Sequence, residues 1–352
     1  ARNGGPAEGA RAGHGPFVGA FASSALGDVS PNLGGAVCRG GPRRGQPCEP
    51  FHSTCPDDRG RPRNELCTAG GPGSDMFDST RIIAQRQTDV AGALLARALR
   101  DAHAPRQGGG AGRAGGGGTD GRMAIVNGAI GAVHAWVRMP GLHVAETTPG
   151  GPSALCSPAF GEAFAAGTTD GPGMFDFEQG SNSTPPFWNF IVDLIHKPSK
   201  AEMACHAPKP ILLPTGDVHF PHAWSPSTVP IQLLRLGSSL VIAALPTELS
   251  TMAGRRLRAA LASRLRELGV LDADGAVVIA GLSNSYADYT VTYEEYQAQR
   301  YEGASTIYGP HQLAAYTQEL LKLALDLADG GPGGHGTAPE DFTAGMISGE
   351  PR

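Results

Sequence analysis

The sequence predicts an α/β fold, and the evidence lies mainly in its last third. Residues 229–236 and 240–245 are apolar runs of strand length, and a helical pattern follows over 247–268. A short apolar run at 276–280 and a second helical pattern at 311–328 come next. Strands that alternate with helices in this way are typical of α/β proteins.

Each of the two helical patterns has one apolar stripe, which is the face expected to cover a sheet. In the first helix the residues expected to point inward are Met252, Leu257, Leu261, Leu265 and Leu268. In the second they are Leu313, Leu320, Leu321, Ala324 and Leu327.

The elements before residue 229 are predicted from shorter signals. An apolar stretch at 17–21 predicts a strand that ends just before Ser30, and the alternation over 133–138 predicts a half-buried strand. The segment 33–75 is expected to be a loop region with cysteines, and 150–228 is rich in loops. An amphipathic helix is expected over about 75–102 from the spacing of its apolar residues, Ile82, Ile83, Val90, Leu94, Leu95 and Leu99.

Composition divides the 352 residues into a core region and low-complexity tracts, because 51 glycines and 29 prolines are concentrated in a few segments. We expect a low-complexity leader at 1–15, a flexible surface insertion at 105–122 and a linker at 329–352. The net charge of −5 comes without a long run of one sign, which argues against nucleic acid as the partner. A small molecule, a lipid or a protein fits better.

Six cysteines are present, four of them within one short stretch at Cys38, Cys48, Cys55 and Cys67. Their spacing lacks the C-x-x-C pairs of zinc ribbons, so it favours disulfides over metal ligation or free thiols. Disulfides indicate an oxidising compartment.

Three residues are candidates for chemistry. Ser30 lies in the hexapeptide GDVSPN, which is either an ordinary β-turn or a strained loop that presents a nucleophile. Glu248 and Tyr289 follow two predicted strands, where ligands gather in α/β sheets. Alone, Glu248 is equally explained as a residue in the first turn of a helix, and Tyr289 as a structural hydrogen-bonding group.

Over residues 16–328 the chain resembles the second half of the catalytic domain of neutral ceramidases. The motifs that carry this resemblance are, in order, GDVSPN, MFDST, FAAGTTDG, KPILLPTG, GRRLR and TYEEYQAQRYEGASTIYGPH. The resemblance implies a mixed-sheet, zinc-hydrolase-like catalytic domain, present here in part and carrying disulfide-stapled loop insertions. It also implies that residues 329–352 lead towards an immunoglobulin-like domain.

The family hydrolyses the amide bond of ceramide to sphingosine and a fatty acid. The resemblance assigns Ser30 as the nucleophile, Glu248 and Tyr289 as zinc ligands, and Tyr301 as a residue that assists at the substrate carbonyl. It implies ceramide and related N-acylsphingoid lipids as substrates, peripheral contact with a membrane surface, and an extracellular or secretory-pathway location. It also implies disulfides that join Cys38 to Cys55, Cys48 to Cys67 and Cys156 to Cys205.

Two further zinc ligands in the family are histidines that precede the nucleophile. Here only His14 precedes Ser30, and it matches neither family motif. We therefore expect the two histidines in a missing N-terminal segment and interpret the chain as a fragment. The histidines after Ser30 match positions that are not ligands in the family, and structural roles are expected for them; they include His134, His219, His222 and His311.

Two questions stay open at this stage. Asp28 is the one obvious base near Ser30, so Ser30 either attacks the amide or orients a zinc-bound water. A non-catalytic extracellular module that binds lipid surfaces is the alternative function, and the absence of a G-x-S-x-G motif disfavours a metal-free serine hydrolase.

Overall fold

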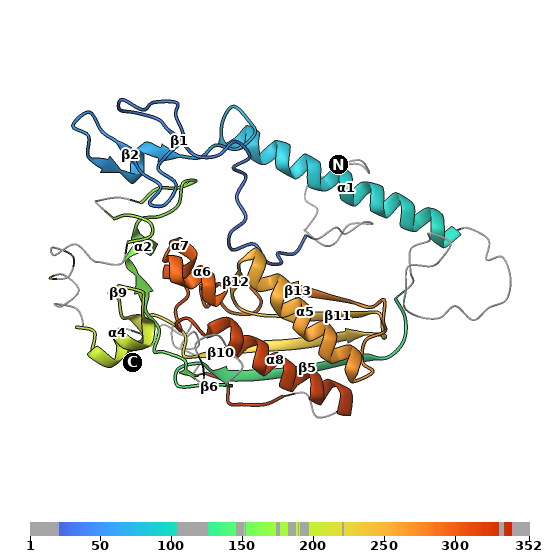
Figure 1. Ribbon diagram of the computed structural model, residues 1–352. Helices are drawn as coiled ribbons and strands as arrows, with labels where there is room; N and C mark the ends of the chain where they lie inside the picture. Colours follow the sequence, from blue (N-terminus) through green and yellow to red (C-terminus); the bar gives the residue numbers. More distant parts are fainter. Residues whose placement is uncertain are drawn as a thin grey trace, which may run out of the picture.

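The computed structural model describes most of the chain (Figure 1). The described residues are 21–103, 126–145, 151, 153–173, 177–181, 188, 190, 197–219, 222–330 and 334–339. The expected leader, the insertion at 105–122, nearly all of the apolar stretch at 17–21 and the tail from 340 lie outside them.

A four-stranded mixed sheet forms the centre, in the order β13-β11-β10-β5. Its strands are β5 (Ile130–Arg138), β10 (Thr228–Leu236), β11 (Leu240–Ala244) and β13 (Ala276–Ala280). Strand β10 is antiparallel to both neighbours, whereas β11 and β13 are parallel. All four strands were expected from the sequence, and the mixed α/β class is confirmed.

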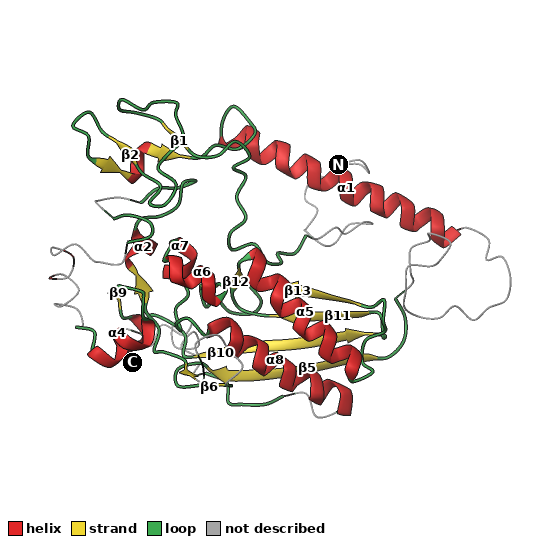
Figure 2. Cartoon of the chain, viewed as in Figure 1, coloured by secondary structure: helices red, strands yellow, loops and turns green. Residues whose placement is uncertain are grey.

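Helices α5 (Thr251–Glu267) and α8 (Gln312–Asp329) lie side by side over one face of this sheet (Figure 2). Leu257, Leu261 and Leu265 of α5 are buried in the main core, as predicted. Met252 was also expected to point inward, but it is 41% exposed. It lies in the first turn of α5, at the N-terminal end of the helix.

The predicted start of α5 at residue 247 is wrong by four residues. Ser250 is the N-cap and accepts a hydrogen bond from the backbone N–H of Ala253. The two residues before it form a short strand, β12 (Glu248–Leu249), which pairs in parallel with β14 (Tyr289–Thr290). Pairing with a distant strand thus takes these residues out of the helix, so Glu248 does not lie in a helical first turn.

The opposite face of the sheet carries an apolar row, formed by residues that are in register across all four strands: Ala132, Leu234, Ile242 and Val278. Leu234 and Val278 are 40% and 46% exposed. A strand buried on one face usually alternates apolar and polar residues, whereas continuous apolar runs are typical of strands covered on both faces. Both faces of this sheet are therefore suited to burial.

Helix α1 (Met76–His103) confirms the helix predicted at about 75–102. It lies apart from the sheet and its two covering helices (Figure 1). Its apolar residues are largely exposed, with Val90 at 63% and Leu94 at 50%. The amphipathic pattern therefore forms a helix here without burying its apolar side.

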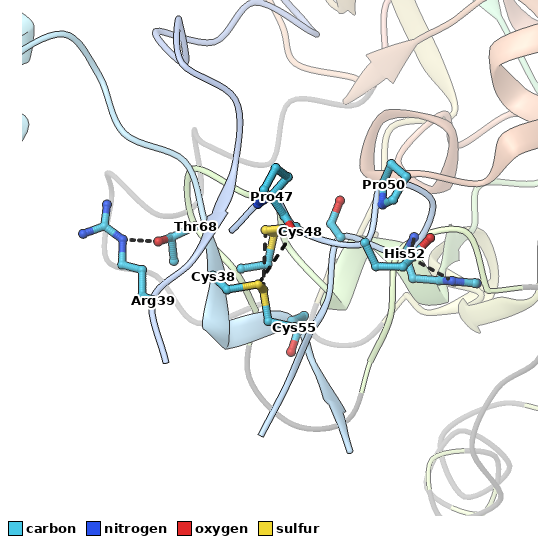
Figure 3. The surroundings of a disulfide bond; sticks show 12 residues. Cys38, Arg39, Pro47, Cys48, Pro50, His52, Cys55 and Thr68 are labelled. Atoms are coloured by element: carbon cyan, nitrogen blue, oxygen red, sulfur yellow. Dashed lines mark hydrogen bonds and ion pairs between the residues drawn. A yellow bond between two sulfur atoms is a disulfide. The ribbon is translucent and has the colours of Figure 1, made fainter. Parts of the chain in front are cut away.

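The cysteine-rich segment forms two small antiparallel ladders and a 3-10 helix. The ladders pair β1 (Val37–Cys38) with β4 (Cys67–Thr68), and β2 (Cys55–Pro56) with β3 (Pro62–Arg63). The 3-10 helix spans Asn64–Leu66. All three predicted disulfides are present, Cys38–Cys55, Cys48–Cys67 and Cys156–Cys205, and Figure 3 shows the surroundings of the first.

Short elements connect these parts. They are β6 (His143–Val144), β7 (Ser153–Ala154), β8 (Phe160–Gly161), α2 (Glu162–Ala165), α4 (Lys200–His206), β9 (Ile211–Leu213), a 3-10 turn (Thr215–Asp217), α6 (Tyr293–Ala298) and α7 (Tyr301–Ala304). Among the helices in the described part of the chain, none combines the length and apolar character needed to cross a bilayer.

Candidate functional site

Glu248 and Tyr289, which lie 41 residues apart in sequence, are direct partners in the β12–β14 ladder. The pairing is parallel, so both side chains leave the same face of the two-stranded sheet. Both residues are half-buried. Gln312 of α8 stabilises the ladder, because its Nε2 donates to the backbone oxygen of Tyr289 at 2.8 Å.

Tyr301 lies beside this pair. Its ring is 5.4 Å from the Tyr289 ring, edge to face, and 5.9 Å from the Phe164 ring, stacked. Its backbone N–H donates to Oε1 of Gln179 at 2.7 Å. Ring contacts on two sides and a partly buried hydrogen bond restrict the position of the Tyr301 hydroxyl. The structure thus brings together three of the four predicted site residues.

Tyr286 also belongs to the cluster, although the sequence reasoning did not select it. Its hydroxyl donates to Oε1 of Glu248 at 2.9 Å. Its proximity could have been noticed from the sequence, because Tyr286 and Tyr289 are the two tyrosines of the pentapeptide SYADY, residues 285–289. One carboxylate is therefore flanked by two phenols from the same loop.

The loop that carries these tyrosines has an unusual backbone. Leu282, Asn284 and Asp288 have positive φ angles of 57°, 63° and 53°. Such conformations are costly for residues other than glycine, and they concentrate at functional sites. The Asp288 backbone is held by Thr247, whose hydroxyl donates to its carbonyl oxygen at 2.7 Å.

The electrostatics of the cluster disfavour additional negative charge. Burial raises the pKa of Tyr289, and the nearby Glu248 carboxylate raises it further. Burial likewise raises the pKa of Asp288 to about 6, with Lys209 opposing the shift and Glu248 adding to it. A group of oxygen atoms that resists deprotonation in this way is a place where a cation would be favourable.

Lys209 is a buried residue that interacts electrostatically with Asp288 of this cluster. Its side chain makes hydrogen bonds to backbone oxygens. It is 3% exposed, and Nζ donates to the backbone oxygens of Ala159 at 3.1 Å and Thr306 at 2.7 Å. Burial lowers the pKa of this lysine well below its usual value. Lys209 therefore ties the segment after α7 to the one before β8.

The GDVSPN loop is attached to the strand that carries Glu248. The Gly27 N–H donates to the Leu249 oxygen at 2.8 Å, and a Cβ at position 27 would lie 2.8 Å from the Glu248 backbone oxygen, so glycine is required there. Asp28 Oδ1 accepts two hydrogen bonds from Thr251, from its N–H and its hydroxyl, both at 2.7 Å. The loop is thus fixed to the start of α5.

Ser30 is exposed at the tip of this loop, and its Oγ accepts a hydrogen bond from the Asn32 N–H at 3.1 Å. The turn interpretation of the hexapeptide therefore describes its backbone. Asp28, considered as a base for Ser30, instead uses Oδ1 to anchor the loop. Ser30 thus lies on the segment next to Glu248, but its side chain is not seen in contact with that of Glu248.

The cysteine-rich segment reaches the site through Arg300, the residue before Tyr301. Its guanidinium donates to the Phe51 oxygen at 2.8 Å and to the Ser53 hydroxyl at 2.6 Å. These two acceptors lie between Cys48 and Cys55, in the loop that the disulfides close. The disulfides therefore stabilise the position of the Tyr301 segment indirectly.

The donor set can be compared with what zinc requires. Glu248 and Tyr289 offer two oxygen ligands, whereas zinc usually takes four ligands with nitrogen or sulfur among them. In the described residues, the one group of three or more His, Cys, Asp or Glu side chains close enough to share an ion is Cys38, Cys48 and Cys55, and these are in disulfides. Glu248 and Tyr289 thus offer half of the usual number of zinc ligands.

Two of the histidines discussed above have packing roles. The His311 ring lies 5.4 Å from that of Tyr293, and the His134 ring lies 5.1 Å from that of Trp136. His219 and His222 are exposed, and His14 lies outside the described residues.

Comparisons with known proteins agree on one family. A model described as neutral/alkaline non-lysosomal ceramidase, N-terminal, matches residues 6–318. Neutral ceramidase 3 of Arabidopsis thaliana is 43% identical over 336 residues, which are 94% of this chain and 41% of that protein. The neutral ceramidase of Drosophila melanogaster is 43% identical over 329 residues, which are 91% of this chain and 42% of that protein.

A solved structure is similar as well. The crystal structure of neutral ceramidase from Pseudomonas aeruginosa superposes with a TM-score of 0.57 at 28% identity, covering 78% of this chain and 36% of that one. The chain therefore spans about two fifths of the length of the curated relatives that it matches.

Proposed function

The chain belongs to the neutral/alkaline non-lysosomal ceramidase family, and from this we propose that it supplies part of the active site of a hydrolase that cleaves the N-acyl amide bond of ceramide. The products would be sphingosine and a free fatty acid. The observation that carries the proposal is the register of β12 and β14, which pairs Glu248 with Tyr289 and sets Tyr301 against Tyr289.

In the proposed reaction the Ser30 hydroxyl is the nucleophile. Its Oγ gives up the hydroxyl proton as it bonds to the amide carbon. The C–N bond then breaks as the nitrogen takes up that proton, so sphingosine leaves as the free amine. Water next hydrolyses the acyl ester, which releases the fatty acid and restores the Ser30 hydroxyl. The Asn32 N–H and the Asp28–Thr251 contacts hold the loop in place during these steps.

Tyr301 is proposed to donate a hydrogen bond to the substrate carbonyl oxygen as negative charge develops there. This role requires a neutral phenol. Burial raises the pKa of Tyr301 above its ordinary value, so the hydroxyl keeps its proton at neutral pH. The flanking rings of Phe164 and Tyr289 limit its rotation.

Glu248 and Tyr289 are proposed as two ligands of a zinc ion, with two histidines from a further segment as the others. Bound zinc would polarise the amide carbonyl as a Lewis acid. The supporting observation is the oxygen-rich cluster with raised pKa values at Tyr289 and Asp288. Tyr286 is proposed to orient the Glu248 carboxylate through its hydrogen bond.

The disulfides support an oxidising compartment, so we propose an extracellular or secretory-pathway location. The proposed substrates, ceramide and related N-acylsphingoid lipids, reside in membranes, which implies peripheral contact with a membrane surface. No role with nucleic acid is proposed.

The test is release of a labelled fatty acid from ceramide by a protein that contains this chain together with the upstream segment expected to carry the histidines. Ser30→Ala and Glu248→Ala should each abolish hydrolysis, and only Glu248→Ala should also lower bound zinc. Arg258→Ala on the exposed face of α5 is the matched control. Full hydrolysis by Glu248→Ala would rule out the assignment, and ceramide binding without turnover in the parent protein would favour the lipid-binding module.

A further inference from the structure

A groove of about 490 Å³ lies between α5 and α8, on the helical side of the sheet. Ala260 of α5 and Leu321 and Leu325 of α8 contribute to its apolar walls. The rings of Tyr293 and His311, 5.4 Å apart, also line it. None of Ser30, Glu248, Tyr289 or Tyr301 lines it, so the groove is separate from the candidate active site.

The charged side chains that line this groove are all cationic: Arg256, Arg264 and Lys322. Arg264 comes from one wall and Lys322 from the other. Each is paired within its own helix, Arg264 with Glu267 at 3.2 Å and Lys322 with Glu319 at 2.7 Å. The Arg264–Glu267 pair is exposed, and the Lys322 side chain is 60% exposed although that of Glu319 is 15% exposed. Ion pairs at this spacing near the surface contribute little, so a ligand carboxylate can replace them.

Arg256 differs from the other two cations. Its guanidinium is 2.7 Å from Glu294 of α6, so it joins two separate elements. The three carboxylate partners do not line the groove. An anionic group is therefore best accommodated by Arg264 and Lys322, where no structural link between elements has to be broken.

We propose that this groove binds a free single-chain carboxylate, with its hydrocarbon tail against the apolar walls and its carboxylate at Arg264 and Lys322. A concave site between two helices suits one inserted tail, whereas a bilayer is engaged by apolar groups that protrude. The fatty acid of the proposed reaction belongs to this class, but the groove does not depend on that reaction.

The first experiment is calorimetric titration of the 352-residue chain with decanoate. Saturable binding of one molecule per chain is expected. Hexanoate should bind about tenfold or more weakly, because it buries fewer methylene groups. Decanol, which lacks the charge, should also bind about tenfold more weakly.

Variants then locate the site. Arg264→Glu with Lys322→Glu should lower decanoate affinity by about tenfold or more, and Ala314→Trp should lower it by filling the groove. Arg258→Glu is the matched control, since it reverses an exposed charge on α5 outside the groove. The decanoate affinity of this variant should stay within about twofold of that of the parent chain. Circular dichroism of each variant confirms that the fold is retained.

Three results would overturn the proposal. The first is the absence of saturable decanoate binding to the parent chain. The second is an equal loss of affinity in the groove variant and in the Arg258→Glu control. The third is binding to vesicles of anionic phospholipid with no binding of monomeric decanoate, which would identify a membrane-binding surface instead.

Discussion

The hydroxyl of Tyr301 provides the sharpest test at the scale of single residues. Tyr301→Phe keeps the ring contacts with Tyr289 and Phe164 and removes only the proposed donor. Loss of one donor to a developing oxyanion typically lowers kcat by about 10²-fold to 10³-fold. We expect that loss, with little change in KM or in thermal stability, in the protein that also contains the upstream segment, measured by ceramide hydrolysis and thermal melting.

Tyr296→Phe is the control for the Tyr301 variant. It removes a buried hydroxyl that donates to the His206 backbone oxygen at 2.9 Å, away from the proposed chemistry. This variant should lose about 1 kcal/mol of stability and keep its kcat. Equal losses of kcat in both variants would show that Tyr301 acts through folding alone.

His206 predicts a dependence of stability on pH. It is 1% exposed, its Nε2 lies 2.8 Å from the Ser157 oxygen, and burial lowers its pKa to about 3. The unfolded chain, with a histidine pKa of about 6.5, therefore binds the proton first as pH falls. This contribution to stability is present above about pH 6.5 and is lost progressively towards pH 3, by about 2 kcal/mol at pH 5.

His206→Gln keeps a hydrogen-bond donor but cannot titrate, so its stability should fall less between pH 7 and pH 5. Urea unfolding at the two pH values measures the difference. His143→Gln, at an exposed position in β6, is the control and should behave like the parent chain. An unchanged pH dependence in His206→Gln would contradict the assignment of this effect to the buried ring.

At the scale of elements, Arg300 links the disulfide-closed loop to α7. Its contacts with Ser53 and Phe51 predict an energetic coupling between the two segments. In a double-mutant cycle, Arg300→Met and Ser53→Ala should show a coupling energy of about 1 kcal/mol in urea unfolding. Arg258→Met combined with Ser53→Ala should show none, and a coupling near zero for the Arg300 pair would mean that the contact does not stabilise the segment.

Some of these elements could be predicted from sequence patterns and others could not. Sequence periodicity predicts the four sheet strands and the helices at 76–103, 251–267 and 312–329. Each of these elements is long enough for its apolar residues to recur on one face. Strands β12 and β14 are not predicted in this way, because two residues each carry no period and their pairing joins positions 41 apart. Their position after predicted strands made Glu248 and Tyr289 candidates, and the family resemblance gave each a role. Neither argument predicted that the two residues pair, and Tyr286 was missed.

For the whole molecule, the sheet has one covered face and one apolar face that is exposed among the described residues. Leu234 and Val278 lie on the exposed face, and α1 lies apart from the sheet with Val90 and Leu94 exposed. Contiguous exposed apolar side chains commonly mark interaction surfaces. This exposed apolar surface agrees with the finding that relatives are more than twice as long as this chain.

The proposed ligand pair leads to a prediction about metal. With Glu248 and Tyr289 as two of four ligands, the 352-residue chain alone should hold well under one zinc per molecule after dialysis and should hydrolyse little or no ceramide. Tight zinc sites derive their affinity from a full ligand set, so removing half of it weakens binding by many orders of magnitude. Metal analysis provides the measurement, and Glu248→Ala provides the control, because the residual zinc should fall further only if this carboxylate binds it. One tightly bound zinc that survives dialysis in the parent chain would mean that the described residues, or those beside them, already complete the site.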